Sequence, residues 1–208
     1  MSTNPPRFPR WTIIRNFLDP WDHRSLLTAV RKHEDRFVPT TIASSKGGER
    51  AEIAHRSSRK LSAAVCEWKE LLRPRLEALF PSILPAVGLR AQGYDSLELE
   101  IVASNDGDHF GRHIDTLYGG APGGEKSARF LSGVYYFFSD PRAFSGGELR
   151  FYTFFGSSSE FFDIEPQDNS IIFFPSFAPH EVRPVRCATG AFADSRFTVN
   201  CWFHRAHS

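Results

Sequence analysis

The chain has little of several features that mark common classes of protein. It has three cysteines in 208 residues, Cys66, Cys187 and Cys201, and they form no C-x-x-C pair. An odd number of widely spaced cysteines argues against a disulfide framework or a zinc knuckle and favours a reducing compartment. The 25 basic and 24 acidic residues leave a net charge of +1. Bulk charge therefore offers no reason to expect a nucleic-acid or anionic-membrane partner.

Long hydrophobic runs are also missing. No segment is long enough to span a bilayer, and the polar, proline-rich stretch from Met1 to Trp11 lacks the apolar core of a signal peptide. We therefore expect a cytoplasmic protein with no membrane partner, and the sequence leaves open a monomer or a homodimer. Phenylalanine, by contrast, is abundant at 20 residues, which predicts a core packed with aromatic rings.

The first 95 residues are expected to be mostly helical. Asp19 and Pro20 are typical of a helix start, and a second helix is predicted over Arg59 to Leu72. Pro81 and Pro85 are expected to mark the exit from this helical part. We interpret residues 1–95 as support for a core formed by residues 96–208, with all 208 residues in one domain.

The second half of the chain has the pattern of short strands. Leu97, Leu99 and Ile101 alternate with Glu98 and Glu100, and similar stretches recur between clusters of turn residues. Many short strands with regular turns predict a β-sandwich or β-barrel. The expected strands are residues 97–103, 130–138, 148–155, 161–164, 170–174, 181–185 and 196–203.

Three side chains in this β region suggest a metal site. His113 and Asp115 stand in Gly-Arg-His-Ile-Asp-Thr, and His180 follows a proline in Phe-Ala-Pro-His-Glu-Val. Residues i and i+2 of a strand point to the same side, so the first two can reach one ion. Two imidazoles and one carboxylate suit iron(II) and leave positions open for a co-substrate and dioxygen. The alternative is a surface pair and a structural histidine.

Six motifs in a fixed order extend this pattern from about Leu97 to Phe203. Together they resemble the 2-oxoglutarate- and iron(II)-dependent dioxygenases of the prolyl 4-hydroxylase-like branch. Any one of these motifs alone would be a weak signal. The motifs are Asp106-Gly107 ahead of His113-Ile-Asp115, Gly133 to Phe138, Ser145 to Tyr152, Pro166 to Pro175, His180 to Val185 and Arg196 to Phe203.

The resemblance implies a mainly β fold with N-terminal helices and a jelly-roll-like double-stranded β-helix as its core. It implies that His113, Asp115 and His180 are the catalytic metal ligands. Arg196 matches the residue that holds the distal carboxylate of 2-oxoglutarate, because a guanidinium offers two parallel donors. Co-substrate-binding positions are also matched by Tyr136, Thr198, Asn200 and Trp202.

The chain departs from the family pattern in two places. Ala103 and Ser104 stand where a tyrosine often precedes the His-x-Asp pair, so one co-substrate hydrogen bond is expected to be missing or replaced. The gap between His180 and Arg196 is also long, which makes Arg183 and Arg186 alternatives to Arg196 as the clamp. Arg196 is favoured because it opens the run that matches the last strand of the family, whereas Arg183 lies in the short stretch just after His180. Gly146 and Gly147 are interpreted as turn residues.

The resemblance implies an oxygenase that uses iron(II), 2-oxoglutarate and dioxygen, with ascorbate as an optional addition. Such an enzyme hydroxylates an unactivated C–H bond and forms succinate and carbon dioxide. We expect a small or carrier-borne amino-acid-like substrate. The alternatives are a peptidyl-prolyl or other protein hydroxylase, a desaturating, epoxidising or ring-forming enzyme, and a non-catalytic metal-binding β-helix protein.

Two further expectations concern the entrance of the site. One of the arginines Arg112, Arg129 and Arg142 could contact a substrate carboxylate, or all three could be surface charges. The glycine-rich segment Leu117 to Ser127 directly follows the His-x-Asp pair, so it is expected to be a lid.

Overall fold

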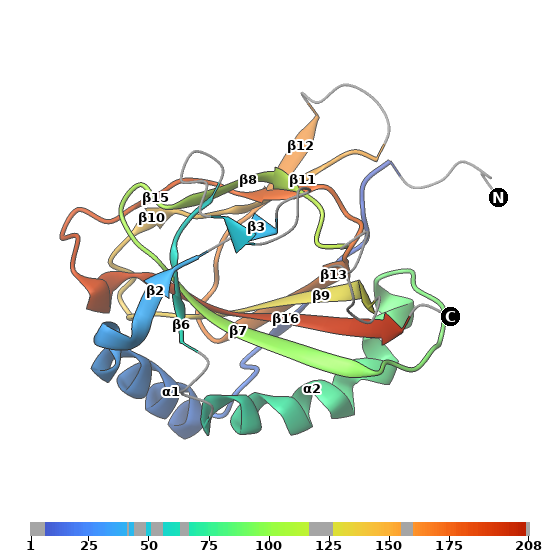
Figure 1. The fold of residues 1–208 in the computed structure, drawn as a ribbon, viewed down its shortest axis with the longest axis horizontal. Coiled ribbons are helices and arrows are strands. Elements are labelled where there is room, and N and C mark those ends of the chain that lie inside the picture. Colours follow the sequence, from blue (N-terminus) through green and yellow to red (C-terminus); the bar gives the residue numbers. More distant parts are fainter. Residues whose placement is uncertain are drawn as a thin grey trace.

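Two antiparallel sheets face each other, and two helices lie along the outer side of the larger sheet (Figure 1). The computed structural model describes residues 7–40, 42–43, 49–50, 56–62, 67–116, 127–154 and 160–206. The larger sheet has the strand order β1-β13-β9-β16-β7-β6-β2, and the smaller sheet has the order β12-β11-β14-β8-β5. This is the predicted double-stranded β-helix with N-terminal helices.

The strands of the large sheet come from both halves of the chain. The four long ones, β7, β9, β13 and β16, agree with predicted strands, whereas β1, β2 and β6 precede residue 95 and were not predicted. The seven strands are β1 (Thr12–Arg15), β2 (Phe37–Pro39), β6 (Arg59–Leu61), β7 (Ser96–Ser104), β9 (Ser127–Phe137), β13 (Ser170–Pro175) and β16 (Arg196–Ala206).

The small sheet lies over the large one and is formed by shorter strands. Two further two-stranded pairs, β3 with β4 and β10 with β15, complete the strand content of the described residues. These strands are β5 (Arg56–Ser57), β8 (His109–His113), β11 (Leu149–Tyr152), β12 (Phe161–Ile164), β14 (His180–Val182), β3 (Ile42–Ala43), β4 (Glu49–Arg50), β10 (Ser145–Gly146) and β15 (Val185–Arg186). Two 3-10 turns, η1 (Glu34–Arg36) and η2 (Phe192–Asp194), also occur.

Helix α1 (Pro20–Lys32) begins where the sequence predicts it. The Asp19 side chain accepts hydrogen bonds from the backbone N–H groups of Trp21 and Asp22, which caps the helix. Proline suits the first helical position, because the N–H group that it lacks has no partner within the helix. Leu26 and Val30 are fully buried against the large sheet, so the apolar face of the helix fixes its position.

The second predicted helix was wrong at its start. Residues Arg59–Leu61 form β6, which pairs with β7 on one side and with β2 on the other. Strand pairing satisfies the backbone of so short a segment, and three residues carry too little periodicity to show it. Helix α2 instead runs over Glu67–Ala86 and contains Pro81 and Pro85, which were expected to mark its exit.

The large sheet separates two hydrophobic cores. One core lies between this sheet and the helices, and it contains Leu26, Leu76, Phe80 and one face of β16. The other core lies between the two sheets and is rich in aromatic rings, with Phe151 packed edge-on against Phe174. The abundance of phenylalanine is therefore used on both sides of the sheet.

Strand β16 shows how one strand serves both sides. Alternate side chains of a strand point to opposite faces of its sheet. Phe197, Val199, Cys201 and Phe203 belong to the core beside the helices. The residues between them, Arg196, Thr198, Asn200 and Trp202, line a pocket between the two sheets. The side that faces the small sheet is therefore the side on which a ligand can be held.

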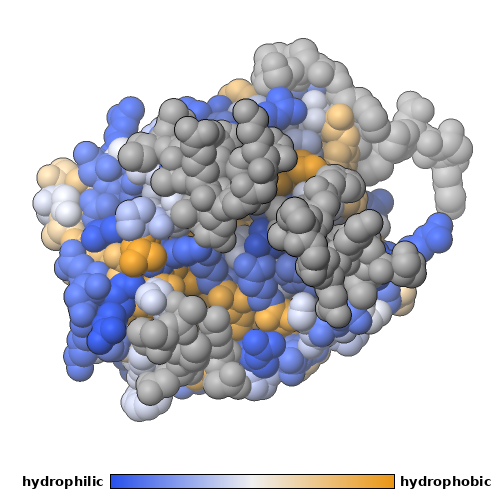
Figure 2. Space-filling model, in the orientation of Figure 1, coloured by the Kyte–Doolittle hydropathy of each residue, from blue (hydrophilic) through white to orange (hydrophobic). Residues whose placement is uncertain are grey.

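On the face shown in Figure 2, the described residues are mainly hydrophilic with separate hydrophobic patches, as is usual for a folded protein. Among the described residues, no helix is long and apolar enough to cross a membrane. The proposed lid, Leu117 to Ser127, falls outside the described residues over 117–126.

Candidate metal and co-substrate site

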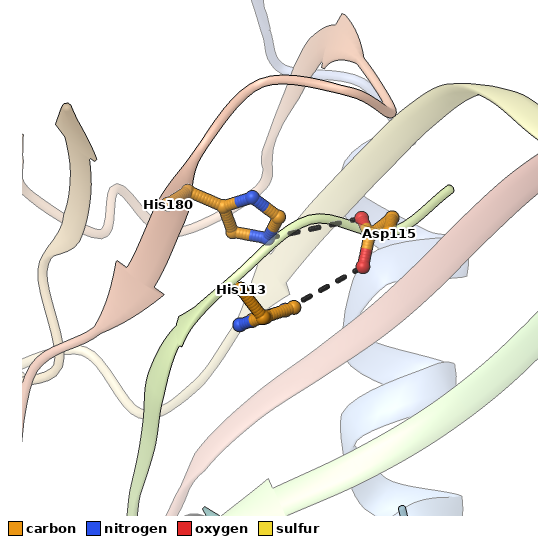
Figure 3. Close-up of side chains that lie close together, drawn as sticks. All are labelled: His113, Asp115 and His180. Atoms are coloured by element: carbon orange, nitrogen blue, oxygen red, sulfur yellow. Dashed lines mark ion pairs between the residues drawn. The ribbon is translucent and has the colours of Figure 1, made fainter. Parts of the chain in front are cut away.

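The three predicted metal ligands lie together where two neighbouring strands of the small sheet, β8 and β14, end and begin (Figure 3). His113 ends β8, His180 begins β14, and the antiparallel pairing of these strands places the two histidines opposite each other. Asp115 follows two residues after His113. One ligand atom from each side chain lies within 4.8 Å of the others, and among the described residues these three form the one such group of His, Cys, Asp and Glu side chains.

Both imidazoles are oriented by backbone carbonyls. The Nδ1 atom of His113 lies 2.7 Å from the Gly111 carbonyl oxygen, and the Nδ1 atom of His180 lies 2.9 Å from that of Ala178. A carbonyl oxygen only accepts hydrogen bonds, so Nδ1 carries the hydrogen and Nε2 keeps its lone pair. These Nε2 atoms lie 3.5 Å and 3.8 Å from the two oxygens of Asp115. Two nitrogen atoms with free lone pairs, which can bind a metal, therefore lie close to the carboxylate.

The charges of the three side chains suit a cation. Burial, with the nearby His113 ring, lowers the pKa of His180 to about 4, so this ring is neutral at neutral pH. Burial alone raises the pKa of the Asp115 carboxyl, but the two histidine rings and the Ser132 hydroxyl lower it well below its usual value. A buried carboxylate beside two imidazoles is a ligand set that iron(II) accepts.

Two serines that the sequence gave no reason to select hold the Asp115 carboxylate. The Ser132 hydroxyl donates to Oδ2 of Asp115 at 2.7 Å and lies 2.8 Å from the Ser176 hydroxyl. The Ser176 carbonyl accepts the backbone N–H of Asp115 at 2.8 Å. An ionised carboxylate only accepts, so the Ser132 proton points to Asp115, and Ser132 in turn accepts from Ser176. The carboxylate is thus fixed from both ends.

A bulge in β8 places a second ring beside His113. His180 lies opposite His113 and Val182 lies opposite Phe110, so β8 has one residue more than β14 over this interval. Such a bulge changes which side chains share a face. The rings of Phe110 and His113 are stacked with their centres 3.6 Å apart. Phe110 therefore restricts the rotation of the His113 ring.

Arg196, at the start of β16, lines the same pocket as the three metal ligands. Its side chain is buried, and its guanidinium carbon lies 5.0 Å from the centre of the Tyr136 ring. Among the described residues, the Nε and Nη2 atoms of Arg196 and the Tyr136 hydroxyl have no hydrogen-bond partner. Buried donors without partners are costly, so their presence here indicates a ligand that accepts hydrogen bonds. The distal carboxylate of 2-oxoglutarate fits these donors.

Gly147 makes room for this arginine. Its φ is +72°, and a Cβ atom at this position would lie 2.6 Å from Cδ of Arg196. We expected Gly147 to serve a turn, and the structure shows that the space beside it is also needed for the clamp. The competing arginines are placed differently: Arg186 is exposed, and the half-exposed Arg183 binds Glu181 at 2.9 Å. Burial therefore favours Arg196.

The remaining predicted positions also lie in this region. Thr198, Asn200 and Trp202 line the pocket, and Tyr136 is next to Thr198 in the pairing of β9 with β16. Ser104, one of the two residues at the position where the family pattern led us to expect a tyrosine, lines the pocket and pairs with Arg196. The structure thus brings all the predicted site residues into one region between the sheets.

The three arginines considered for a substrate carboxylate do not line the pocket. Arg112 stacks on the Tyr152 ring at 4.2 Å. Arg129 binds Glu98 at 2.8 Å and lies over the Trp202 ring, and Arg142 binds Glu165 at 3.2 Å. A fourth arginine, Arg56 of β5, lines the pocket instead. Its strand has only two residues, which is too short for sequence patterns to detect.

Comparison with known proteins agrees with this geometry. The model of the 2OG-Fe(II) oxygenase superfamily matches residues 99–204, which include all the residues assigned to the metal and to the co-substrate. An uncharacterized PKHD-type hydroxylase of Synechocystis sp. is 35% identical over 200 residues, which cover 92% of this chain and 62% of the relative. A PKHD-type hydroxylase of Pseudoalteromonas atlantica is 32% identical over 79 residues, which cover 38% of this chain and 33% of the relative. The chain thus spans at most about three fifths of these relatives.

Solved structures share the fold. A prolyl-4-hydroxylase of Pseudomonas putida matches with a TM-score of 0.64 and 21% identity, over 95% of this chain and 93% of that chain. A prolyl hydroxylase of Trichoplax adhaerens, solved with a peptide of hypoxia inducible factor, has a TM-score of 0.64 and 17% identity, over 94% and 83%. At these identities the similarity concerns the fold.

Proposed function

Because this chain belongs to the 2OG-Fe(II) oxygenase superfamily, we propose that it is an iron(II)- and 2-oxoglutarate-dependent dioxygenase. It hydroxylates an unactivated C–H bond and forms succinate and carbon dioxide. One observation carries the proposal: three converging ligand atoms lie in the same pocket as a buried guanidinium with unpartnered donors.

Each residue has a defined task in this proposal. His113, Asp115 and His180 would hold the iron through two imidazole nitrogens and one carboxylate oxygen. Arg196 and Tyr136 bind the distal carboxylate of 2-oxoglutarate, while Thr198, Asn200 and Trp202 form the wall beside it. The bound iron supplies the oxidising chemistry together with dioxygen, and the protein supplies orientation and a pocket with little water.

The substrate we propose is a small or carrier-borne amino-acid-like molecule. A peptidyl-prolyl or other protein hydroxylase is the second candidate, and two proteins that share the fold are prolyl hydroxylases. Desaturation, epoxidation and ring formation use the same site and differ in how the substrate is placed. A non-catalytic metal-binding protein is the remaining alternative. The lid over residues 117–127, the cytoplasmic location and the choice between monomer and homodimer stay predictions.

Anaerobic reconstitution tests the metal and co-substrate assignments separately. With iron(II) and 2-oxoglutarate, the protein is expected to show a weak visible charge-transfer band, because the co-substrate chelates the iron. His180→Ala should lose the band through loss of metal binding. Arg196→Ala should keep metal binding and weaken co-substrate binding about a hundredfold or more, since it breaks a buried charged pair.

Arg183→Ala is the matched control, because it removes an arginine that lies outside the buried clamp. An unchanged band in His180→Ala would contradict the metal site. Unchanged 2-oxoglutarate affinity in Arg196→Ala, with a loss in Arg183→Ala, would move the clamp to Arg183. Absence of succinate formation with every substrate tested, despite binding of both iron and 2-oxoglutarate, would favour the non-catalytic alternative.

A further inference from the structure

One side of helix α1 faces solvent and forms an open groove with the start of α2, on the outer side of the large sheet (Figure 1). Four exposed residues of α1 in this groove follow one another at spacings of three or four, which places them on one face of the helix. The groove, called the α1 groove below, also includes Trp68 of α2. The four residues are Trp21, Arg24, Thr28 and Lys32.

The two cations of the α1 groove have no partner. Neither Arg24 nor Lys32 forms an ion pair or a hydrogen bond with the rest of the described chain. By contrast, Arg31 of the same helix donates to the Ala193 carbonyl oxygen at 2.8 Å. No acidic side chain occurs among the described residues that line the groove. Its positive charge is therefore not compensated and is available to a ligand.

Trp21 adds a large apolar surface to this charge. At 70%, it is the most exposed of the large hydrophobic side chains that the structure describes. A tryptophan buries a large area when a partner covers it, and tryptophan and arginine are enriched among the residues that contribute most at protein interfaces. Trp21 lies one helical turn before Arg24, so an apolar contact site and a free guanidinium are neighbours. This combination suits a polypeptide that carries both apolar and acidic side chains.

Trp68 connects the α1 groove with a cavity of about 330 Å³ between α2 and the large sheet. Its ring lines both, and its Nε1 atom is buried without a hydrogen-bond partner within the described ranges. A buried indole N–H usually has an acceptor, so a ligand is missing here. The acids in the cavity wall are already paired, Glu98 with Arg129 at 2.8 Å and Glu100 with Lys60 at 3.7 Å. The rest of the wall is mainly aliphatic and includes Val38, Leu61, Leu72, Leu99 and Ile101.

We propose that the α1 groove and this cavity bind an acidic segment of a partner polypeptide that carries an apolar anchor residue. Carboxylates of the segment pair with Arg24 and Lys32, the anchor enters the cavity, and a main-chain carbonyl accepts from Nε1 of Trp68. The net charge of +1 gives the chain no broad basic surface for a nucleic acid. The inference does not depend on the proposed function, because the large sheet separates this site from the metal ligands.

Labelled peptides test the proposal with the full chain. An array of short peptides with varied orders of glutamate, aspartate, leucine, phenylalanine and serine is screened, and the tightest peptide is titrated by fluorescence anisotropy. Wild type should bind it with an affinity that falls as salt is raised, because surface ion pairs are screened. Exchanging the acids of the peptide for lysine, or its apolar residues for serine, should each weaken binding about tenfold or more.

Three variants assign the contacts. Arg24→Glu combined with Lys32→Glu should weaken binding of the acidic peptide about tenfold or more, since attraction becomes repulsion. Trp21→Ala should weaken it about tenfold as well, because the exposed ring is lost. Val38→Trp fills the cavity from an exposed position in its wall. It should remove the advantage of apolar residues over serine in the peptide and leave the salt dependence unchanged.

Matched controls separate these contacts from general surface effects. Arg10→Glu combined with Arg90→Glu changes the net charge by the same amount at exposed positions outside the groove. Trp11→Ala removes another exposed tryptophan. Both controls should bind the peptide like wild type. All variants should keep the unfolding temperature and the affinity for Mn(II) and 2-oxoglutarate, because the substituted side chains are exposed and lie outside the metal site.

Several outcomes overturn the inference. One is that wild type binds no acidic peptide, or binds acidic and basic peptides equally. Another is equal weakening by the charge reversals in the groove and in the control, which would mean that net charge alone acts. Tighter binding of a single-stranded oligonucleotide or of phosphatidylserine vesicles, lost when Arg24 and Lys32 are reversed, would assign the groove to a different class of partner. Iron and 2-oxoglutarate binding are measured separately, so none of these outcomes affects the proposed function.

Discussion

The Ser132 hydroxyl orients the Asp115 carboxylate, so its removal should affect metal binding before it affects the fold. Ser132→Ala leaves Oδ2 of Asp115 without its 2.7 Å donor. Groups that orient a metal ligand typically contribute about 10–100-fold in metal affinity, and we expect a loss in this range. Titration with Mn(II) or Co(II) measures it directly.

Two other substitutions make the Ser132 result specific. Ser132→Thr keeps the hydroxyl and should restore most of the affinity. Ser170→Ala removes another buried strand serine, whose hydroxyl donates to the Gln167 carbonyl away from the site, and should leave affinity unchanged. Equal affinities in Ser132→Ala and wild type would show that the backbone contacts of Asp115 suffice.

Buried His180 should make the metal-free protein sensitive to mild acid. In the unfolded chain this ring takes up a proton below its ordinary pKa of 6.5, whereas the folded chain delays protonation until about pH 4. The unfolded state therefore binds more protons between these values, and stability falls as the pH is lowered through this window. The loss is on the order of 2–3 kcal/mol. Urea unfolding between pH 7 and pH 4.5 measures it, and His180→Gln should show a weaker dependence.

At the scale of a single strand, the neighbouring residues Tyr135 and Tyr136 of β9 should have opposite roles. The Tyr135 hydroxyl lies 2.7 Å from Nδ1 of His23 and donates to Asn169 at 3.1 Å, which ties β9 to α1 and to the chain before β13. The Tyr136 hydroxyl is buried on the other face without a partner among the described residues. One tyrosine thus serves the fold and the other is available to a ligand.

Substitution by phenylalanine separates these roles. Tyr135→Phe should lower the free energy of unfolding by about 1–3 kcal/mol, because buried polar partners are left unsatisfied, and should leave 2-oxoglutarate affinity unchanged. Tyr136→Phe should leave stability unchanged and weaken 2-oxoglutarate binding about tenfold. The two variants serve as controls for each other in urea unfolding and in 2-oxoglutarate titration. Similar behaviour of both would contradict the alternation.

The turn between β10 and β11 is expected to set the position of the co-substrate clamp. In Gly147→Ala, the new methyl group would collide with Arg196 and displace it, so 2-oxoglutarate affinity should fall about tenfold or more. Gly190→Ala is a matched control, because Gly190 has a similar φ of +61° but no atom within 4 Å of the added Cβ. It should cost about 1 kcal/mol in stability and leave affinity unchanged. Equal affinity losses in both variants would show that backbone strain, and not contact with Arg196, is responsible.

At the scale of the whole molecule, bound ligands should stabilise the fold in two separable steps. The metal ligands lie in the small sheet and the segment after β8, while the clamp lies in the large sheet, so both sheets hold the complete ligand set. Each ligand at a hundred times its Kd should add about 2.7 kcal/mol, seen as a higher Tm. Arg196→Ala should keep the step caused by Mn(II) and lose that caused by 2-oxoglutarate. Removal of the metal with a chelator should abolish both.

The part of the molecule that could be predicted from its sequence is the part with regular patterns. The long strands β7, β9 and β16 have alternating side chains, and the metal ligands are residue types with few other common roles in such an order. Ser132 and Ser176 could not be predicted, since serine occurs everywhere and their pairing needs three separate segments. The short strands β5 and β6 escaped detection because tertiary pairing, rather than local preference, forms them.

The alternation along β16 has a consequence for how this chain can change in length. A one-residue insertion or deletion within the strand would turn Phe197 and Val199 toward the pocket. It would turn Thr198 and Asn200 toward the hydrophobic core beside the helices. The exposed residues 188–190, between β15 and β16, contain no strand and impose no such phase, whereas Cys187 and Phe192 on either side of them are buried. Foreign peptides or tags should therefore be accommodated there. A one-residue insertion or deletion in β16 would instead damage folding and ligand binding together.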